Sequence, residues 1–144
     1  MSTSRKLLCT LYAVIALAAL VATWSQNIAY LEANPLRFLA NFFGDTRANE
    51  ATQSITVDIV LLFLAAAIFM VIEARKHTIG LVWLYIVGGM LIAISVTFPL
   101  FLIARERRLA EKGDVNPSLP VLDKALLAAF TVFAAVAVVW VDLA

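Results

Sequence analysis

Four long apolar runs constrain the fold of this chain more than any other feature. They cover residues 7–24, 55–72, 80–103 and 121–141. A helix needs about 20 mostly apolar residues to cross the hydrocarbon core of a bilayer, and each run has about this length. Backbone groups find no water partner in lipid, so each run should be helical, and none alternates as barrel strands do. The sequence predicts an all-α integral membrane protein, a four-helix bundle that forms a single transmembrane domain over residues 1–144.

The composition excludes several other classes of protein. Hydrophobic residues make up 63% of the chain and charged residues 15%, against roughly 45–50% and about 25% in soluble domains. A soluble domain of this size could not bury so large an apolar share. Cys9 is the only cysteine, which excludes an internal disulfide, and a net charge of +1 gives no excess for nucleic acid. The expected partner is the lipid bilayer, with no nucleic acid.

The connection over residues 25–54 is long for a compact bundle, and it contains residues that are typical of the start and the end of a helix. Asn34 and Pro35 can begin a helix, and Gly44 can end one. Apolar side chains recur at helical spacing over residues 36–43. Two alternatives remain open here: a short amphipathic helix in the headgroup plane, or a loop folded over the bundle ends.

The cations give conflicting indications of orientation. Arg5 and Lys6 precede the first run, and Arg75 and Lys76 follow the second, so both flanks place the N-terminus in the cytoplasm. Because these flanks agree at the end that inserts first, we expect both termini on the cytoplasmic side of the cell membrane. The loop over residues 104–120 disagrees, since four straight helices would place it outside. That arrangement leaves four of the 11 cations inside and seven outside.

Small residues predict how the helices pack. Helices in lipid associate by close approach of small side chains rather than by hydrophobicity. The third run has Gly89, Ala93 and Thr97 at four-residue spacing, with Tyr85 one turn earlier. We therefore expect the third helix to be central. Whether such faces meet within one chain, in a homo-oligomer or against a partner membrane subunit stays open.

Asp58 is the sharpest candidate for a functional residue. An ionised carboxylate at the bilayer centre costs roughly 2.5–3.5 kcal/mol on insertion scales, so such residues are few. Asp58 lies near the start of the second run, where the first turn of a helix favours a negative charge. The structural alternative is a dipole, cap or interhelical hydrogen-bond role. The functional alternative is a proton or cation site, or a partner for an arginine.

Pro99 is the second candidate, because it interrupts the third run. A proline inside a helix removes one backbone hydrogen bond and crowds the carbonyl four residues earlier, here that of Ser95. A run of about 24 residues is about 36 Å long, more than a hydrocarbon core of about 30 Å, so a kink or tilt is expected at Pro99. The alternatives are a packing kink and a small cavity lined by Ser95 and Thr97.

No constellation for catalysis or metal binding stands out. His77 is the only histidine and lies beside Arg75 and Lys76, so we expect a solvated loop residue. Metal sites need several converging ligands, and nucleophilic catalysis needs a nucleophile beside a base. The sequence predicts no catalytic, cofactor-binding or metal site, and a protein that is not an enzyme.

Short motifs follow one another in a specific order from Trp24 to about Arg108. They are Trp24-Ser25-Gln26, Ala33-Asn34-Pro35, Val57-Asp58-Ile59, Glu73-Ala74-Arg75-Lys76, Trp83, Phe98-Pro99-Leu100-Phe101-Leu102 and Arg105-Glu106. In these motifs the chain resembles a bacterial family of small membrane proteins, Domain of Unknown Function 2834. The resemblance implies a membrane topology and a family-like core over about residues 1–108, and it adds weight to Asp58 and Pro99. Such proteins are typically three helices, so the run over 121–141 is an additional helix, and no reaction is implied.

Three functional hypotheses remain open. The first is a non-enzymatic membrane protein that acts through helix–helix association, as a homo-oligomer or accessory subunit. The second is a small proton- or solute-coupled transporter that uses Asp58 and the break at Pro99. The third is a lipid- or isoprenoid-binding protein with a pocket near Tyr85, Ser95 and Thr97.

Overall fold

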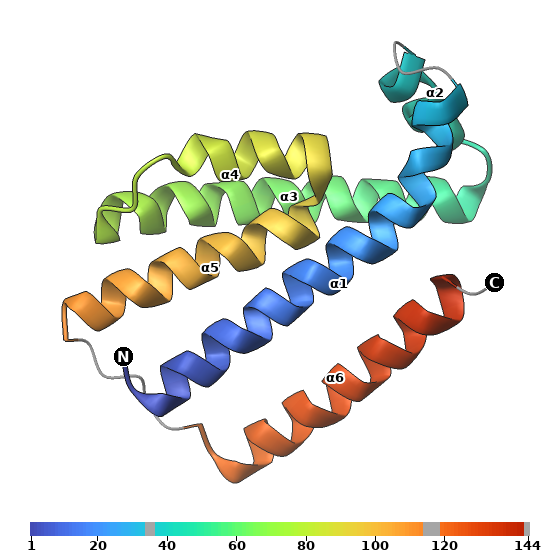
Figure 1. Cartoon of the computed structure of the whole chain (residues 1–144). Helices are drawn as coiled ribbons and strands as arrows, with labels where there is room; N and C mark the ends of the chain where they lie inside the picture. The colour runs from blue at the N-terminus through green and yellow to red at the C-terminus, as the bar shows by residue number, and fades with distance from the viewer. Residues whose placement is uncertain (34–36, 114–118, 143–144) are drawn as a thin grey trace. The chain divides into compact units, whose positions relative to one another are not determined.

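The computed structural model describes residues 1–33, 37–113 and 119–142, and these divide into two compact units, Met1–Gly113 and Asp114–Ala144. The first unit contains α1, α2, α3, α4, a π-helical segment η2 and α5, and the second contains α6 (Figure 1). Their bounds are α1 Thr3–Ala33, α2 Phe38–Asp45, α3 Glu50–His77, α4 Val82–Gly88, η2 Gly89–Ala93, α5 Ile94–Glu111 and α6 Val121–Asp142.

Four helical stretches are long and apolar enough to cross a membrane, as predicted. They are Thr3–Tyr30, Glu50–His77, Val82–Glu111 and Val121–Asp142. The described residues contain no strand, so the all-α membrane class is confirmed. The helices are longer than the apolar runs because they continue into polar flanks. At 1.5 Å per residue α1, with 31 residues, is about 46 Å long and exceeds a hydrocarbon core of about 30 Å.

The third stretch reverses its direction at Ala93. The backbone of Ala93 is extended, with φ −179° and ψ 142°, and α5 then runs back beside α4 (Figure 1). The rings of Tyr85 and Phe101 have centroids 5.7 Å apart. A straight helix would separate residues 16 positions apart by about 24 Å. Residues 82–111 therefore form a helical hairpin rather than one straight helix.

The reversal lies at Ala93 and not at Pro99, so the expected position of the break is wrong. Pro99 is buried inside α5, which continues through it. Because α5 begins at Ile94, the missing N–H of Pro99 removes a hydrogen bond close to the helix start, where little of the ladder is disturbed. The first limb of the hairpin, α4 with η2, has 12 residues. It is about 18 Å long, which is shorter than a hydrocarbon core of about 30 Å.

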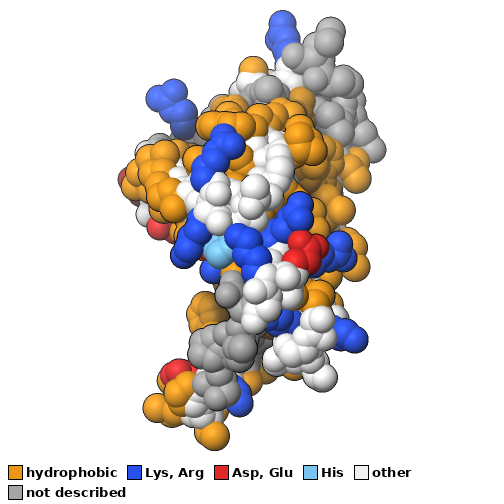
Figure 2. Space-filling model, turned by 90° about the vertical axis from the view of Figure 1, so that its left-hand side faces the viewer, with side chains coloured by type: hydrophobic (Ala, Val, Ile, Leu, Met, Phe, Trp, Pro, Cys, Tyr) orange, Lys and Arg blue, Asp and Glu red, His pale blue; other side chains and the backbone are white. Residues whose placement is uncertain are grey.

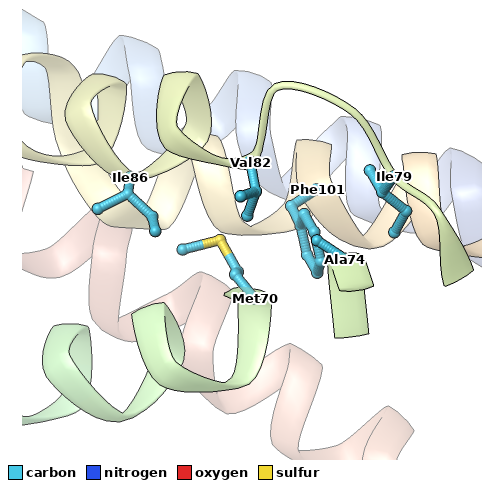
Figure 3. Close-up of a cluster of buried hydrophobic side chains, with 6 residues drawn as sticks. All are labelled: Met70, Ala74, Ile79, Val82, Ile86 and Phe101. Atoms are coloured by element: carbon cyan, nitrogen blue, oxygen red, sulfur yellow. The ribbon is translucent and has the colours of Figure 1, made fainter. Parts of the chain in front are cut away.

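A cluster of buried apolar side chains fastens the hairpin to α3. Met70 and Phe101 have no exposed surface and lie at its centre. The other members of the cluster are Ala74, Ile79, Val82 and Ile86 (Figure 3). The cluster thus joins α3, the turn before α4, α4 itself and α5.

Gly89 lies at the tip of the hairpin, where the backbone comes close to α3. A Cβ atom on Gly89 would lie 2.9 Å from Cζ of Phe63 and 3.0 Å from Oγ1 of Thr97. Real Cβ atoms are not found so close to other atoms, so only glycine fits here without movement of its neighbours. The tip therefore meets α3 at Phe63, near the middle of that helix.

Of the two alternatives for the first connection, the short helix is present, as α2. Gly44 lies inside α2 rather than ending it, and the cap residue is Thr46. Asn34 and Pro35, the predicted start, lie outside the described residues. Aromatic side chains hold α2 against α1, since Phe38 stacks on Trp24 and Phe42 meets Tyr30 edge-on, and other rings extend this row. A position in the headgroup plane stays a prediction.

Candidate functional site

Charged side chains from three helices converge at the end of the first unit where α3 ends. Arg105 of α5 donates through Nε to Oε2 of Glu73 of α3 at 2.5 Å and through Nη1 to Oε1 of Glu106 at 3.1 Å. Arg5 of α1 donates to the backbone carbonyl of Glu106 at 3.1 Å, and its Nη1 lies 3.4 Å from Oε2 of the same residue. We call these four residues the ionic cluster.

Three of the four residues of the ionic cluster are buried and Arg105 is half-buried, which decides the role of the cluster. Arg5 is 3% exposed, Glu106 5% and Glu73 7%. Charges are costly to bury unless they are paired, and each buried carboxylate here has an arginine partner. The cluster therefore ties α1, α3 and α5 together. Sequence reasoning missed it, although Arg105-Glu106 and Glu73 stood among the family-like motifs.

His77 belongs beside this cluster, so the prediction of a solvated loop residue is wrong. It is the last residue of α3 and only 7% exposed. Because α3 continues to His77, one helical turn brings the ring back over Glu73, and Nε2 lies 3.3 Å from Oε2 of that carboxylate. The geometry is poor for hydrogen bonding, and neither ring nitrogen has a hydrogen-bond partner among the described residues.

An open groove of about 530 Å³ runs between the start of α4 and the face of α5. Its walls are mostly apolar, from Ile79, Gly80, Tyr85, Leu100, Ile103 and Ala104. Charged side chains line the rest, from Arg107, Arg108 and Glu111 of the last turns of α5. Lys and Arg side chains gather on this end of the molecule around His77 (Figure 2). The groove is therefore apolar inside and basic at its mouth.

The predicted site residues are only partly brought together. Tyr85 lines the groove, whereas Ser95 and Thr97 are not among its described lining. Thr97 is buried between the limbs of the hairpin, with Cγ2 3.2 Å from where a Cβ of Gly88 would lie. Ser95 is exposed on α5. The described groove thus shares only Tyr85 with the cavity expected around Tyr85, Ser95 and Thr97.

Asp58 lies apart from these groups. The side chain of Asn49 caps α3 by accepting from the backbone N–H of Thr52, so the helix begins at Glu50 and the first-turn acid is Glu50. Asp58 lies in the third turn, and its expected place in the first turn is wrong. Its side chain is exposed, and of the residues that the structure describes none forms a hydrogen bond or ion pair with it.

The surroundings of Asp58 are apolar and uncovered. No side chain in the first half of α3, residues 50–62, is buried, whereas the second half, residues 63–77, contains every buried residue of this helix. Exposed side chains around Asp58 include Val57, Leu61 and Leu62. The hairpin thus covers only the second half of α3.

Trp24 has a role at the reversal that its sequence position did not indicate. Nε1 of Trp24 donates to the backbone carbonyl of Ile92 at 3.2 Å. Carbonyls at the end of a helix lack partners within the helix, and an unpaired carbonyl is costly in lipid. Trp24 therefore supplies a hydrogen bond where η2 ends, and α1 helps to fix the tip of the hairpin.

A protein family described as "Protein of unknown function DUF2834" matches residues 11–107. No curated protein and no solved structure matches the chain. The matched residues include most of α1, all of α3 and the hairpin up to Arg107, whereas α6 lies beyond them. Since the match covers more than half of the sequence, the chain belongs to the DUF2834 family, whose function is unknown.

Proposed function

We propose that this chain is a non-enzymatic, multi-pass subunit of the cell membrane that acts by associating with another membrane polypeptide. The observation that supports this most is the first half of α3, in which no side chain is buried and Asp58 lies among exposed apolar residues. Ionisable side chains in membrane helices normally face protein or a water-filled cavity and pair with another group. A partner helix with a cationic or polar side chain would pair with Asp58 and cover this half.

The buried carboxylates favour the same interpretation. A catalytic acid or base must reach a substrate atom, directly or through one water. Glu73 and Glu106 are instead engaged by Arg105, and Glu106 also by Arg5. These acids join helices of one chain, whereas Asp58 lies exposed in an apolar run and is available to another molecule.

Photocrosslinking in native membranes tests the association. Benzoylphenylalanine would replace Leu61, which is one turn from Asp58, or Ile72 in the second half of α3; both native side chains are 59% exposed. We expect a protein adduct from position 61, a much weaker one from 72, and loss of the first in Asp58→Asn. Asp123→Asn, which changes an acid near the start of α6, is the matched control. Equal adducts at both positions, or none at 61, would overturn the proposal.

The hairpin also supports one of the two orientations. Since α5 returns to the end where α3 finishes, Nζ of Lys112 donates to the backbone carbonyl of Lys76 at 3.3 Å. Eight of the ten Lys and Arg residues of the first unit then share one end, and only Arg37 and Arg47 lie near the other. The eight are Arg5, Lys6, Arg75, Lys76, Arg105, Arg107, Arg108 and Lys112.

This charge distribution supports a cytoplasmic N-terminus, because loops rich in Lys and Arg prefer that side. The loop after α5 is then cytoplasmic too. If α6 crosses from this side, the C-terminus lies on the opposite side, unlike the arrangement expected for four straight helices. A bacterial cell membrane with this topology is part of the proposal.

Cysteine labelling in intact cells tests the topology. Cys9→Ser removes the native thiol, and single cysteines then replace Ser2, Ala48 or Lys112. A membrane-impermeant maleimide should label position 48 and leave 2 and 112 protected until the cells are opened. Labelling of 112 together with 48 would support a straight third helix and contradict the hairpin topology.

A further inference from the structure

The groove between α4 and α5 has the dimensions and lining of a ligand site. Its volume is about 530 Å³, within the roughly 300–1,000 Å³ that is typical of small-molecule pockets. Leu100 and Ile103 of α5 line it together with Ile79 of the turn before α4. The groove therefore offers an apolar path for a chain of methylene groups, independently of the association proposed above.

Arg107 is the feature at the mouth that points to an anion. Its side chain is exposed, and of the described residues none forms a hydrogen bond or ion pair with it. Arg108 is engaged, since its Nη1 donates to Oε2 of Glu111 at 2.9 Å. The groove thus carries two guanidinium groups and one carboxylate, and the carboxylate is already paired. A free guanidinium binds phosphate oxygens through two parallel hydrogen bonds.

The relative depth of the two regions indicates a lipid. Along α5, Leu100 and Arg107 are seven residues apart, which separates them by about 10 Å parallel to the helix axis. A phospholipid has the same polarity, with a charged phosphate at the membrane surface and acyl chains below it. Basic pockets between membrane helices are known to suit such headgroups. A soluble anion would use the arginine but gain nothing from the apolar walls.

Tyr85 adds a polar group between the two regions. Its hydroxyl makes no hydrogen bond within the described part of the chain, while its ring packs edge-on against Phe101 at 5.7 Å between centroids. The ring position is thus fixed and the hydroxyl remains able to donate. A hydroxyl here suits the ester oxygens that join acyl chains to a glycerol phosphate.

We propose that the groove binds an anionic phospholipid, with the phosphate on Arg107, the ester region at Tyr85 and an acyl chain along Leu100 and Ile103. A free phosphate compound and a neutral lipid each share only half of this chemistry. They therefore serve as the comparisons that separate the proposal from surface charge and from simple apolar contact.

Native mass spectrometry of the full chain in detergent measures the binding. The probes are phosphatidylglycerol and phosphatidylcholine with the same acyl chains. We expect phosphatidylglycerol to bind at least tenfold more tightly, and Arg107→Gln to remove most of this preference. Arg75→Gln is the matched control, because Arg75 is an exposed cation of α3 outside the groove. It should change the affinity less than twofold.

Two further measurements keep the proposal falsifiable. Tyr85→Phe keeps the ring but removes the hydroxyl, and it should weaken phosphatidylglycerol binding severalfold at an unchanged melting temperature. Glycerol 3-phosphate in excess over the lipid should displace little of it. Equal losses from Arg107→Gln and Arg75→Gln, or full displacement by glycerol 3-phosphate, would show surface charge alone and overturn the proposal. Equal affinity for the two lipids would also overturn it.

Discussion

The two halves of α3 belong to one helix but have different environments. The second half, residues 63–77, packs under the hairpin and buries Met70 and Ala74, whereas no side chain of the first half, residues 50–62, is buried. The boundary falls at Phe63, where the tip of the hairpin meets the helix at Gly89. The position of the reversal at Ala93 therefore decides how much of α3 is covered.

Two carboxylates on this helix illustrate the consequence. Glu73, in the covered half, is bonded to Arg105 and lies against His77. Asp58, in the uncovered half, has no such partner among the described residues. An acid that is paired within its own chain contributes to stability, while an unpaired acid in an apolar stretch contributes only when another molecule supplies the partner. The covered half should therefore control stability and the uncovered half association.

The largest expected effect comes from removing the cation that ties α1 to the covered end. Arg5→Gln leaves Glu106 buried with one fewer arginine, and breaking a buried ion pair costs about 3–5 kcal/mol in soluble proteins. Unfolding of the purified protein in detergent measures the loss. Lys6→Gln is the control, since Lys6 is exposed. If the two variants have the same melting temperature, the ionic cluster does not stabilise the contact of α1 with α5.

A smaller loss of stability is expected from a change at the tip of the hairpin, which marks the boundary between the two halves of α3. Gly89→Ala places a Cβ 2.9 Å from Phe63, and overpacking of this kind costs about 1–3 kcal/mol. Gly80→Ala is the matched control, because nothing lies within 4 Å of its Cβ position. Hydrogen exchange of residues 82–93 should rise in the first variant only. Equal exchange in both variants would place the tip away from α3.

The parts of the fold that follow from apolar length were predictable. The runs at 7–24 and 55–72 lie in α1 and α3, and the run at 121–141 lies in α6, because any 20-residue apolar stretch must become helical in lipid. The hairpin was not predictable from the run at 80–103. The apolar composition of this run is the same whether the helix is straight or folded back. Gly88 and Gly89 are compatible with a hairpin but also with a face along which straight helices pack.

The candidate site was less predictable than the fold, because it depends on contacts between distant residues. Arg5 meets Glu106 across 101 positions of sequence, and only the reversal brings α5 back to that end. His77 looked solvated because its neighbours in sequence are charged, yet α3 continues far enough to turn it inward. Tyr85 lines the described groove, whereas Ser95 and Thr97, which were expected to share a cavity with it, are not among the lining residues because the chain reverses between Tyr85 and Ser95.

The hydrogen bond from Trp24 to Ile92 should have a modest effect on the same boundary. Trp24→Phe keeps an aromatic ring against Phe38 but removes the donor, and a single hydrogen bond contributes about 0.5–1.5 kcal/mol. The melting temperature should fall by a few degrees. Trp83→Phe is the control, because Trp83 is 60% exposed on α4. A fall of equal size in the control would mean that loss of ring area, rather than the donor, explains the result.

The smallest effect on the stability of the isolated chain should come from Asp58→Asn. This variant tests most directly whether the two halves of α3 have different roles. Because Asp58 has no partner among the described residues, the purified variant should melt with the wild type. Glu73→Gln, an identical loss of charge on the covered half of the same helix, should melt well below it, since Arg105 loses its charged partner. A clear fall in the melting temperature of purified Asp58→Asn would show that Asp58 is already paired within the chain. Asp58 would then no longer support the proposal that another polypeptide covers this half of α3.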